Sequence, residues 1–264
     1  RPEDVEEEVK ILAEEGYKEI VLTGIHLTSY GIDFKDEGID FLTLIKRLHA
    51  IDGIERIRFG SLEPRVITET FAEELSKLPK ICPHFHLSLQ SGCDDTLKRM
   101  NRHYTCEEYA ERCAILRKYF ENPAITTDVI VGFPGETEED FNETMRLIDE
   151  VGFDASFSFV YSKRPGTPAA DLPDDTPYEV KLKRLQHLQA VNDARATEIS
   201  KAMLGNIERC LVTGPAKKGE GMLSARTDNN RVVTFEGGPR LIGQMVNIEI
   251  TDVFPHTLGG RLVK

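Results

Sequence analysis

The feature that most constrains the fold is a regular alternation between two spacings of apolar residues. Five times within the first 161 residues, apolar residues at helical spacing precede a short run rich in strand-forming residues. These runs read EIVLTG, IERIRFGS, HFHLSLQ, AITTDVIVGF and ASFSFVY. Strands that are each separated by a helix pair in parallel through right-handed crossovers. The alternation therefore predicts an α/β fold, either a doubly wound sheet or a barrel.

Polar residues follow every one of these runs. In chain order, the segments are TGIHLTSYG, GSLEP, QSGC, GFPGET and YSKRPGT. In parallel α/β folds the carboxyl ends of the strands carry the ligand site. Five polar loops that converge on one mouth favour a barrel or a partial barrel over an open sheet.

The last part of the chain has a different pattern. A loop rich in Pro and Gly leads into a helical stretch from about Tyr178 to Met203, and Gly205 ends it. Short alternating runs with glycine-containing turns then continue to Lys264, which predicts a small antiparallel β-barrel. We therefore expect two domains, residues 1–203 and residues 204–264.

The net charge is unevenly divided between these two regions. The chain carries −12 overall, which argues against a protein coated in positive charge for nucleic acid. Residues 204–264 contain eight Lys or Arg and six Asp or Glu, so this region carries +2 and the rest −14. A mildly basic small barrel on an acidic body is compatible with RNA binding, although an ordinary solvated surface explains +2 equally well.

The cysteines and the hydropathy indicate the compartment. The sequence has no signal-peptide pattern and no apolar run of about 18 residues, which favours a cytoplasmic protein without membrane association. The cysteines show neither CxxC nor CxxxCxxC spacing, so reduced structural thiols are expected. They are Cys82, Cys93, Cys106, Cys113 and Cys210.

Two strand ends combine small and polar residues in a way that suits a polar ligand. Gln90, Ser91 and Gly92 close the third run before a helix expected at Asp94, and they offer N–H groups, a hydroxyl and an amide to a ribose or a carboxylate. An ordinary turn with Asp94 as the N-cap explains the same residues equally well. The pair Thr23-Gly24 ends the first run, where the missing Cβ admits a ligand close to the backbone, or simply makes a turn.

The last two strand ends add an aromatic and a cation. The turn 132–135 precedes a helix capped by Thr137 and Asp140, and its backbone could lie against an adenine ring. Arg164 could hold a phosphate or a carboxylate, with a plain surface arginine as the alternative.

The sequence shows no familiar catalytic motif. It has no GxSxG elbow, no HExxH and no P-loop. His84 and His86 share one face of a strand, but a metal would need a third ligand, so a core or rim role is favoured. We predict no catalytic residue and no metal ligand within this chain.

Taken together and in order, these motifs resemble those of the radical S-adenosylmethionine methylthiotransferases. The matching segments are VLTGIHLTSYG, GSLEP, CPHFHLSLQSGCDDTLKRMNRHYT, TDVIVGFPGETEEDF and YSKRPGTPAA, and the closing segment is similar to the TRAM domain of that family. The third segment most resembles the type that methylthiolates N6-threonylcarbamoyladenosine beside the tRNA anticodon. The isopentenyladenosine type and the ribosomal-protein type are the nearest alternatives.

The resemblance implies a partial TIM-like barrel of six strands, five of them matched here, followed by a TRAM barrel. It also implies two four-iron four-sulfur clusters in the full-length protein, held by an upstream CxxxCxxC loop and an N-terminal domain. None of the five cysteines matches these ligands, so this chain alone is expected to be inactive. A barrel that lacks its first strand is expected to associate along its open edges.

The resemblance further implies a pocket for S-adenosylmethionine, a tRNA anticodon loop as partner, and a reductant and a sulfur donor in the full-length enzyme. A cluster-free RNA-binding barrel remains an alternative of another class, and an aldolase-like barrel lacks a convincing Lys or metal triad. The implied cofactor residues are Thr23 and Gly24 near the methionyl amino group, Gln90, Ser91 and Gly92 near the ribose, Ile130, Gly132 and Tyr161 near the adenine, and Asp128 and Arg164 at the mouth.

Overall fold

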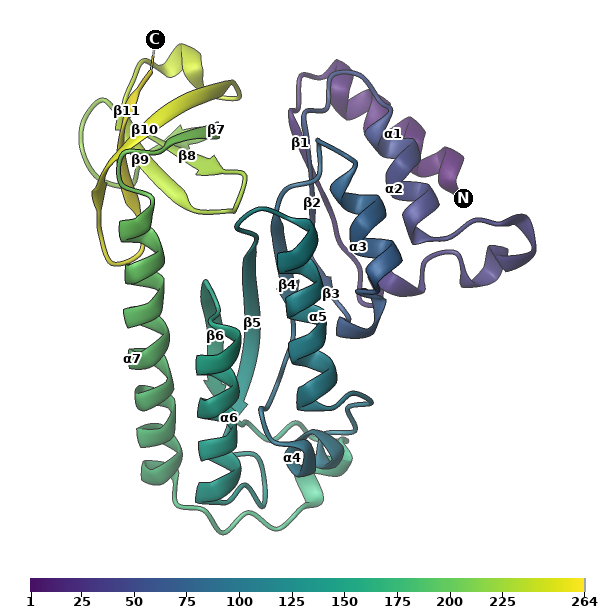
Figure 1. Ribbon diagram of the computed structural model, residues 1–264, viewed down its shortest axis with the longest axis vertical. Helices are drawn as coiled ribbons and strands as arrows, with labels where there is room; N and C mark the ends of the chain where they lie inside the picture. Colours follow the sequence, from purple (N-terminus) through teal and green to yellow (C-terminus); the bar gives the residue numbers. More distant parts are fainter. Residues whose placement is uncertain (264) are drawn as a thin grey trace.

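The computed structural model describes residues 1–263 and consists of a parallel sheet with its helices, one long helix and a small barrel (Figure 1). Lys264, the predicted end of the second domain, lies outside the described residues. The five helix–strand pairs occur in the predicted order. They are α1 (Pro2–Glu14) with β1 (Glu19–Leu22), α2 (Phe41–His49) with β2 (Arg56–Phe59), α3 (Glu69–Ser76) with β4 (His84–Leu87), α5 (Cys106–Tyr119) with β5 (Ala124–Val131), and α6 (Glu138–Val151) with β6 (Ala155–Val160).

Short elements complete this region. After Gly60 the chain continues β2 as β3 (Ser61–Leu62), and α4 (Asp94–Arg99) follows β4. The N-cap of α4 is Cys93 rather than Asp94, whose Oδ1 instead accepts a hydrogen bond from the Cys106 N–H at 2.7 Å. The 3₁₀ turns are η1 (Leu27–Ser29), η2 (Ile32–Glu37), η3 (Pro64–Val66), η4 (Pro168–Asp171) and η5 (Pro239–Leu241).

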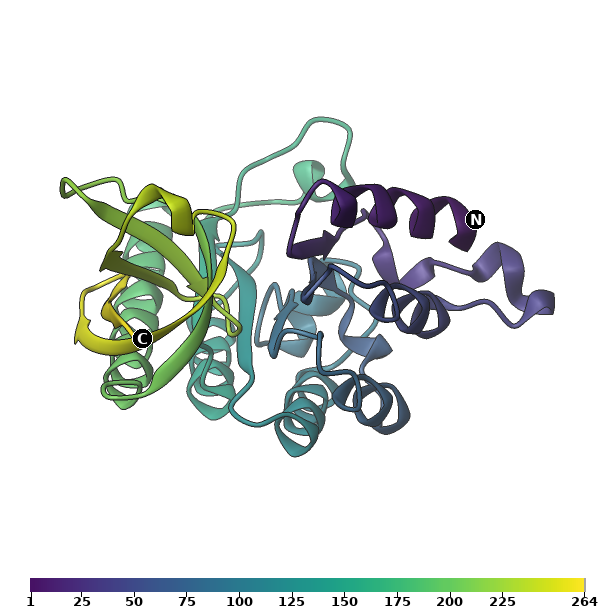
Figure 2. The same ribbon diagram turned by 90° about the horizontal axis from the view of Figure 1, so that it is seen from above.

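All strands of the sheet are parallel. β1 pairs with β2, and β3, β4, β5 and β6 pair in that order. A single bridge between Ile57 and Ile81 joins the two groups. Seen from above, the helices form an arc around one side of the strands (Figure 2). The parallel order confirms the α/β prediction.

Local sequence signals explain where the helices begin and end. Thr105 and Glu108 form a reciprocal capping box at the start of α5, and Thr137 and Asp140 do the same for α6. Gly152 ends α6 with a φ of 64°, which favours glycine because it has no Cβ.

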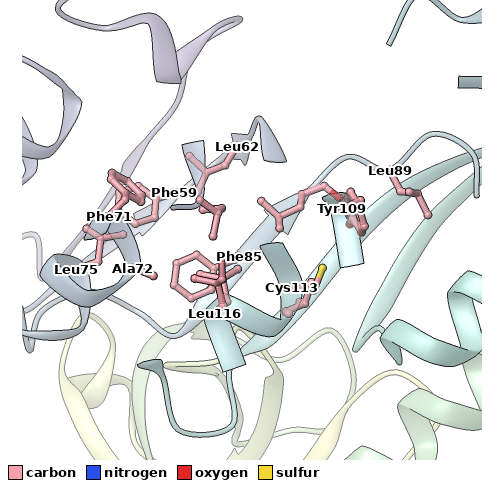
Figure 3. Packing of buried hydrophobic residues seen from close by; sticks show 14 of the residues in the cluster. Phe59, Leu62, Phe71, Ala72, Leu75, Phe85, Leu89, Tyr109, Cys113 and Leu116 are labelled. Atoms are coloured by element: carbon pink, nitrogen blue, oxygen red, sulfur yellow. Dashed lines mark hydrogen bonds between the residues drawn. The ribbon is translucent and has the colours of Figure 1, made fainter. Parts of the chain in front are cut away.

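The hydrophobic core lies between the sheet and these helices (Figure 3). Phe85 of β4 is fully buried, and its ring contacts Phe120 edge-on at a centroid distance of 4.9 Å. Tyr109 of α5 is also fully buried, and its hydroxyl donates to the Leu87 carbonyl at 2.7 Å. Since this bond satisfies the only polar group of the Tyr109 side chain, the ring can serve as core.

The long helix α7 (Tyr178–Ala202) packs against β6 and leads to the small barrel. Its range agrees with the predicted helix to within one residue. None of the described helices combines the length and hydropathy needed to cross a membrane.

The small barrel is closed by five strands, one more than the four alternating runs of the sequence, which are NIERCLVTG, GMLSART, RVVTFEG and QMVNIEITDVF. The additional strand is β11, and it pairs in parallel with β9, so the expectation of a purely antiparallel barrel was wrong. Two glycines, Gly259 and Gly260, weaken its strand signal, yet a Cβ at Gly260 would lie 2.3 Å from Ile248. The strands are β7 (Ile207–Pro215), β8 (Met222–Thr227), β9 (Val232–Glu236), β10 (Met245–Val253) and β11 (Leu258–Leu262).

Candidate functional site

The face of the sheet opposite the helices is not covered by core side chains, and we call it the inner face. Alternate residues of each strand point to it, because successive side chains of a strand lie on opposite faces. Strand register places Val21 beside Arg58, and Asp128 beside Phe157. The inner face therefore carries charged, polar and aromatic side chains.

A cleft of about 1100 Å³ lies over the inner face, and we call it the central cleft. The sheet, α7 and the small barrel all contribute to its lining. Representative lining residues are Arg58, His86, Asp128, Phe157, Asn192 and Asn230. The cleft lies between the parallel sheet and the small barrel.

A row of polar contacts runs along the inner face from β4 to β5. Thr126 Oγ1 lies 3.3 Å from His84 Nε2 and 3.0 Å from His86 Nδ1. His86 Nε2 lies 3.0 Å from Asp128 Oδ2, which also accepts a hydrogen bond from Ser88 at 2.9 Å. The hydrogen bond from His86 lowers the pKa of Asp128. Asp128 is thus held as a carboxylate facing the cleft.

His84 is held in its neutral form. Burial, together with the nearby charge of Arg58, lowers the pKa of His84 to about 3. The unfolded chain binds a proton at this histidine near its ordinary pKa, whereas the folded chain does not, so folding stability falls as the pH drops below about 6.5.

We expect His84→Asn to remove part of this acid sensitivity. At pH 4.5 the buried neutral histidine costs the folded state about 2–3 kcal/mol relative to pH 7.5, because two pKa units correspond to about 2.7 kcal/mol. Urea unfolding of both proteins at the two pH values measures the difference, and the same exchange at the exposed His103 is the matched control. If the unfolding free energies of the wild type and His84→Asn changed equally with pH, His84 would not be the neutral buried group proposed.

An ion network closes the end of the cleft where the strands begin. Arg56 and Arg58, only 1% and 4% exposed, both approach Glu19 Oε2, at 2.6 and 3.2 Å. The contact between Arg56 and Glu19 is an ion pair, but its geometry is not that of a hydrogen bond. Arg56 Nη1 donates to Asp228 Oδ1 at 2.9 Å, and Arg58 Nη1 donates to the Asp228 carbonyl at 3.1 Å. The small barrel is therefore docked by charge at the amino ends of the strands.

Further polar contacts extend this junction. Arg231 pairs with Asp154 at 3.0 Å and donates to Ser200 Oγ, at the end of α7, at 2.8 Å. Arg209 pairs with Glu55 at 2.7 Å. The sheet, α7 and the small barrel thus share one continuous set of contacts.

The opposite end of the sheet, where the strands finish, has a pocket of about 380 Å³. Segments after β1, β3 and β4 contribute to its lining, which includes Ile25, Glu63, Arg65 and Arg102. Glu63 accepts a hydrogen bond from Arg65 at 2.6 Å, so it is a partner for that arginine. Two of the five polar loops, those after β1 and β3, therefore share a pocket with Ser88 and residues 101–104, although none of the ten predicted cofactor residues lines it.

Those ten residues fall into several environments. Thr23 and Gly24 are exposed after β1, and a Cβ on Gly24 would meet nothing closer than 3.6 Å. Gln90 adopts a φ of 71° and bridges to β5, through its N–H to the Asp128 carbonyl and its carbonyl to the Ile130 N–H. Ile130 lies on the inner face beside Phe159.

Ser91 and Gly92 are directed toward α6. The Gly92 N–H donates to Thr144 Oγ1 at 3.0 Å, and Ser91 Oγ lies 3.4 Å from the same atom. A Cβ on Gly92 would lie 2.5 Å from the Thr144 Cα, which is backbone and cannot turn aside. In this structure Gly92 is needed for packing between the turn and α6.

We expect Gly92→Ala to lower the unfolding free energy by about 1–3 kcal/mol, since overpacking forces a backbone shift. Thermal or urea unfolding measures the loss. Gly238→Ala is the matched control, because its Cβ would meet nothing within 4 Å. Equal stability of Gly92→Ala and the wild type would show that the turn has room for a side chain.

The turn after β5 is tied to α7. The buried Glu136 accepts hydrogen bonds from the Gly132 N–H at 2.9 Å and from Arg184 at 2.8 Å. Burial raises the pKa of Glu136. A Cβ on Gly132 would lie 2.5 Å from the Lys181 side chain, so this glycine also serves packing.

The end of β6 holds a buried hydroxyl without a hydrogen-bond partner, the only such side-chain group among the ten predicted residues as the structure describes them. The Tyr161 hydroxyl is buried without a hydrogen-bond partner among the described residues, and its ring meets Phe133 edge-on at 5.0 Å. A buried polar atom without a partner is costly, which suits a site completed by a ligand. Arg164 lies exposed in the following loop.

Residues 1–263 contain no group of three His, Cys, Asp or Glu side chains placed to hold a metal ion. Burial raises the pKa of Cys82 to about 11 and that of Cys113 to about 12, which disfavours the thiolates that bind iron. The residues described here therefore do not fit an iron–sulfur cluster.

Sequence reasoning missed Phe157 and Phe159. In ASFSFVY these rings alternate with small residues, and they are 57% and 56% exposed. Ser156 faces α7 instead, where Asn192 donates to its Oγ at 2.6 Å. The short serine side chains opposite a helix were the available signal.

Residues 1–148, more than half of the chain, match the family described as the radical SAM superfamily. The chain belongs to the radical SAM superfamily. Residues 201–263 match the TRAM domain, which corresponds to the small barrel.

Curated relatives of this radical SAM chain are named for tRNA modification. It is 49% identical over 262 residues to the tRNA-2-methylthio-N(6)-dimethylallyladenosine synthase of Bordetella avium, an alignment of 98% of this chain and 55% of that protein. The protein of the same name from Burkholderia mallei is 47% identical over 268 residues, 99% of this chain and 59% of that protein. The chain thus spans about half the length of these relatives.

Two solved structures show the same fold at low identity. Coproporphyrinogen III oxidase from Escherichia coli, titled a radical SAM enzyme, aligns with a TM-score of 0.56 and 14% identity over 94% of this chain and 58% of that one. The radical S-adenosylmethionine methyltransferase TsrM from Kitasatospora setae aligns at 0.51 and 15%, over 92% and 38%. With the TRAM match, they confirm the predicted partial barrel followed by a small β-barrel.

Proposed function

We propose that this radical SAM chain is part of a methylthiotransferase that adds a methylthio group to an adenosine of tRNA. The observation that carries the proposal is the 49% identity across both domains with a relative named for this modification. The docked small barrel supports it, because it places a module of the TRAM type beside the central cleft.

S-adenosylmethionine fits this proposal at the strand ends. We propose that Tyr161, with its unpartnered hydroxyl, lies near the adenine together with Ile130 and Gly132. Bound S-adenosylmethionine supplies a sulfonium that is cleaved by one-electron reduction. We further propose that the strand-end groups orient the cofactor, namely Thr23, Gly24, Gln90, Ser91, Gly92 and Arg164.

The cluster ligands are a different matter, because the described residues do not fit a cluster. We expect them, with the reductant and the sulfur donor, to involve the part of the relatives' length that this chain does not span. The chain alone is then expected to be inactive.

We propose an N6-dimethylallyl group on the adenosine, following the names of the relatives. The sequence motifs favoured the threonylcarbamoyl type, and the relatives do not support that finer assignment. We also propose that the anticodon loop is the segment bound, that residues 204–264 form the RNA-binding domain beside residues 1–203, and that the reaction takes place in the cytoplasm with tRNA.

A chimera tests the function directly. This chain replaces the aligned segment of the Bordetella avium relative, and the native relative is the matched control. We expect the chimera to restore 2-methylthio-N6-dimethylallyladenosine in the tRNA of a strain without the modification, as detected by mass spectrometry of nucleosides.

The other outcomes of the chimera experiment discriminate the alternatives. Methylthiolated threonylcarbamoyladenosine in the tRNA would support the threonylcarbamoyl type that the sequence motifs favoured. A mass increase on a ribosomal protein would show that the substrate is a protein instead. A chimera that cleaves S-adenosylmethionine but modifies neither tRNA nor ribosomal protein would overturn the methylthiotransferase proposal. A chimera that binds RNA without cleaving S-adenosylmethionine would favour a binding protein.

We also propose that the isolated chain associates through its sheet edges. Among the described residues, β1 pairs with β2 alone and β6 with β5 alone, so each leaves one edge unpaired. Light scattering is expected to show dimers or larger species, and a uniform monomer would refute this.

A further inference from the structure

Two phenylalanines on β6 face the central cleft instead of the core. Phe157 and Phe159 are 57% and 56% exposed, and both line the cleft. Large exposed aromatic side chains on a sheet face are unfavourable in water unless a partner covers them. Strand register sets Phe157 beside Asp128, and Phe159 beside Ile130, one layer closer to the strand ends.

The surroundings of Phe157 are polar and only partly satisfied. Its ring lies 5.9 Å from that of His86, centroid to centroid, at an interplanar angle of 53°. Asp128 Oδ2 is occupied by His86 and Ser88, whereas the hydrogen bonds of the described residues leave its Oδ1 without a donor. A ring stacked on Phe157 would thus find an acceptor at its edge.

The charges of the cleft select the kind of ligand. The lining of the cleft contains three arginines and three aspartates. The charges of these six residues cancel, so they offer no net positive charge to a phosphate. The guanidinium groups are also engaged: Arg58 with Glu19, Arg226 with Asn230 Oδ1 at 2.8 Å, and Arg231 with Asp154. A neutral planar ring with an N–H donor suits this environment better than an anion does.

We propose that the central cleft binds an unstacked adenine base of RNA, with Phe157 as the stacking surface and Asp128 Oδ1 accepting a hydrogen bond from the exocyclic N–H. The inference rests on the proposed tRNA function and deepens it by assigning the residues that hold the base. Adenine carries its donor at N6, and a base lifted out of an RNA loop stacks readily on an aromatic side chain. The cleft volume of about 1100 Å³ is ample for one nucleotide.

Tryptophan fluorescence tests the stacking, because the chain contains no tryptophan. Phe157→Trp is titrated with a stem-loop RNA that carries one adenosine in its loop, and with the same RNA made abasic at that position. We expect quenching by the first RNA and little by the second. Tyr178→Trp, at an exposed position at the start of α7 outside the cleft, is the matched control and should report neither.

Binding assays test the same residues without a fluorophore. Phe157→Ala is expected to weaken binding of the adenosine stem-loop by about tenfold and to leave the abasic RNA unaffected. Replacement of the loop adenosine by N6,N6-dimethyladenosine, which has no N–H donor, should weaken binding to the wild type by a similar factor but not binding to Asp128→Ala.

The outcomes separate this inference from the function on which it rests. RNA binding that Phe157→Ala leaves unchanged, without fluorescence quenching in Phe157→Trp, would overturn the base-binding assignment while the tRNA function stands. Failure of the wild-type chain to bind any stem-loop, together with a chimera that modifies no tRNA, would overturn both. Quenching by the adenosine RNA with the expected discrimination against the abasic RNA supports the assignment.

Discussion

Replacement of Glu19 by Gln is expected to lower the unfolding free energy by about 3–5 kcal/mol, because it removes one partner of a buried charge network. Arg56 and Arg58 are almost fully buried, and Glu19 is the only carboxylate that both approach among the described residues. Without it, Arg56 keeps the carboxylate of Asp228, whereas Arg58 is left with the backbone carbonyls of Asp228 and Thr227. Urea unfolding at neutral pH measures the loss.

Glu139→Gln is the matched control for this exchange. Glu139 pairs with Arg146 at 3.0 Å on the surface, where both side chains are exposed, so the loss should stay below about 1 kcal/mol. Combining Glu19→Gln with Arg58→Met removes one unpaired charge and should recover part of the stability. If Glu19→Gln were no more harmful than Glu139→Gln, the network would not hold the junction.

Arg184→Met, near the start of α7, should also lower the unfolding free energy by about 3–5 kcal/mol. Arg184 donates to the carboxylate and the carbonyl of the buried Glu136, at 2.8 and 3.1 Å. Its removal leaves Glu136 buried with the Gly132 N–H as its remaining donor. The turn that is proposed to lie near the adenine of the cofactor would then lose its anchor.

The pH dependence identifies the cause of that loss. Burial raises the pKa of Glu136, and loss of the arginine should raise it further. Because the folded state then binds a proton more readily than the unfolded state, the damage should be largest at pH 8 and shrink toward pH 5. Arg146→Met, at an exposed ion pair, is the control. A loss that does not vary with pH would point to packing alone.

The order of elements could be predicted because periodicity carries it. Each helix–strand pair follows the apolar spacing, and α7 ends within one residue of its predicted end. β11 could not be predicted in the same way, since Gly259 and Gly260 have no side chains to reveal an alternation. Their place follows from close contacts with neighbouring strands that only the folded barrel brings together.

The direction in which a side chain points was harder to predict than its position along the chain. Gly92 and Gly132 stand at strand ends as expected, but contacts with Thr144 and Lys181 explain why each is glycine. Phe157 lies in a predicted strand, but the exposed face on which its ring lies was not predicted. Sequence spacing defines two faces of a strand, and only tertiary packing decides which of them a helix covers.

The long helix α7 is fastened at both ends, by Arg184 to the turn after β5 and by Ser200 to Arg231 of the small barrel. At 25 residues it spans about 37 Å, so it fixes the distance between the strand-end loops and the small barrel. An insertion of one residue would swing the small barrel by about 100° and break one fastening. Exposed residues of this helix can therefore vary, but its length cannot change without moving the small barrel relative to the strand-end loops.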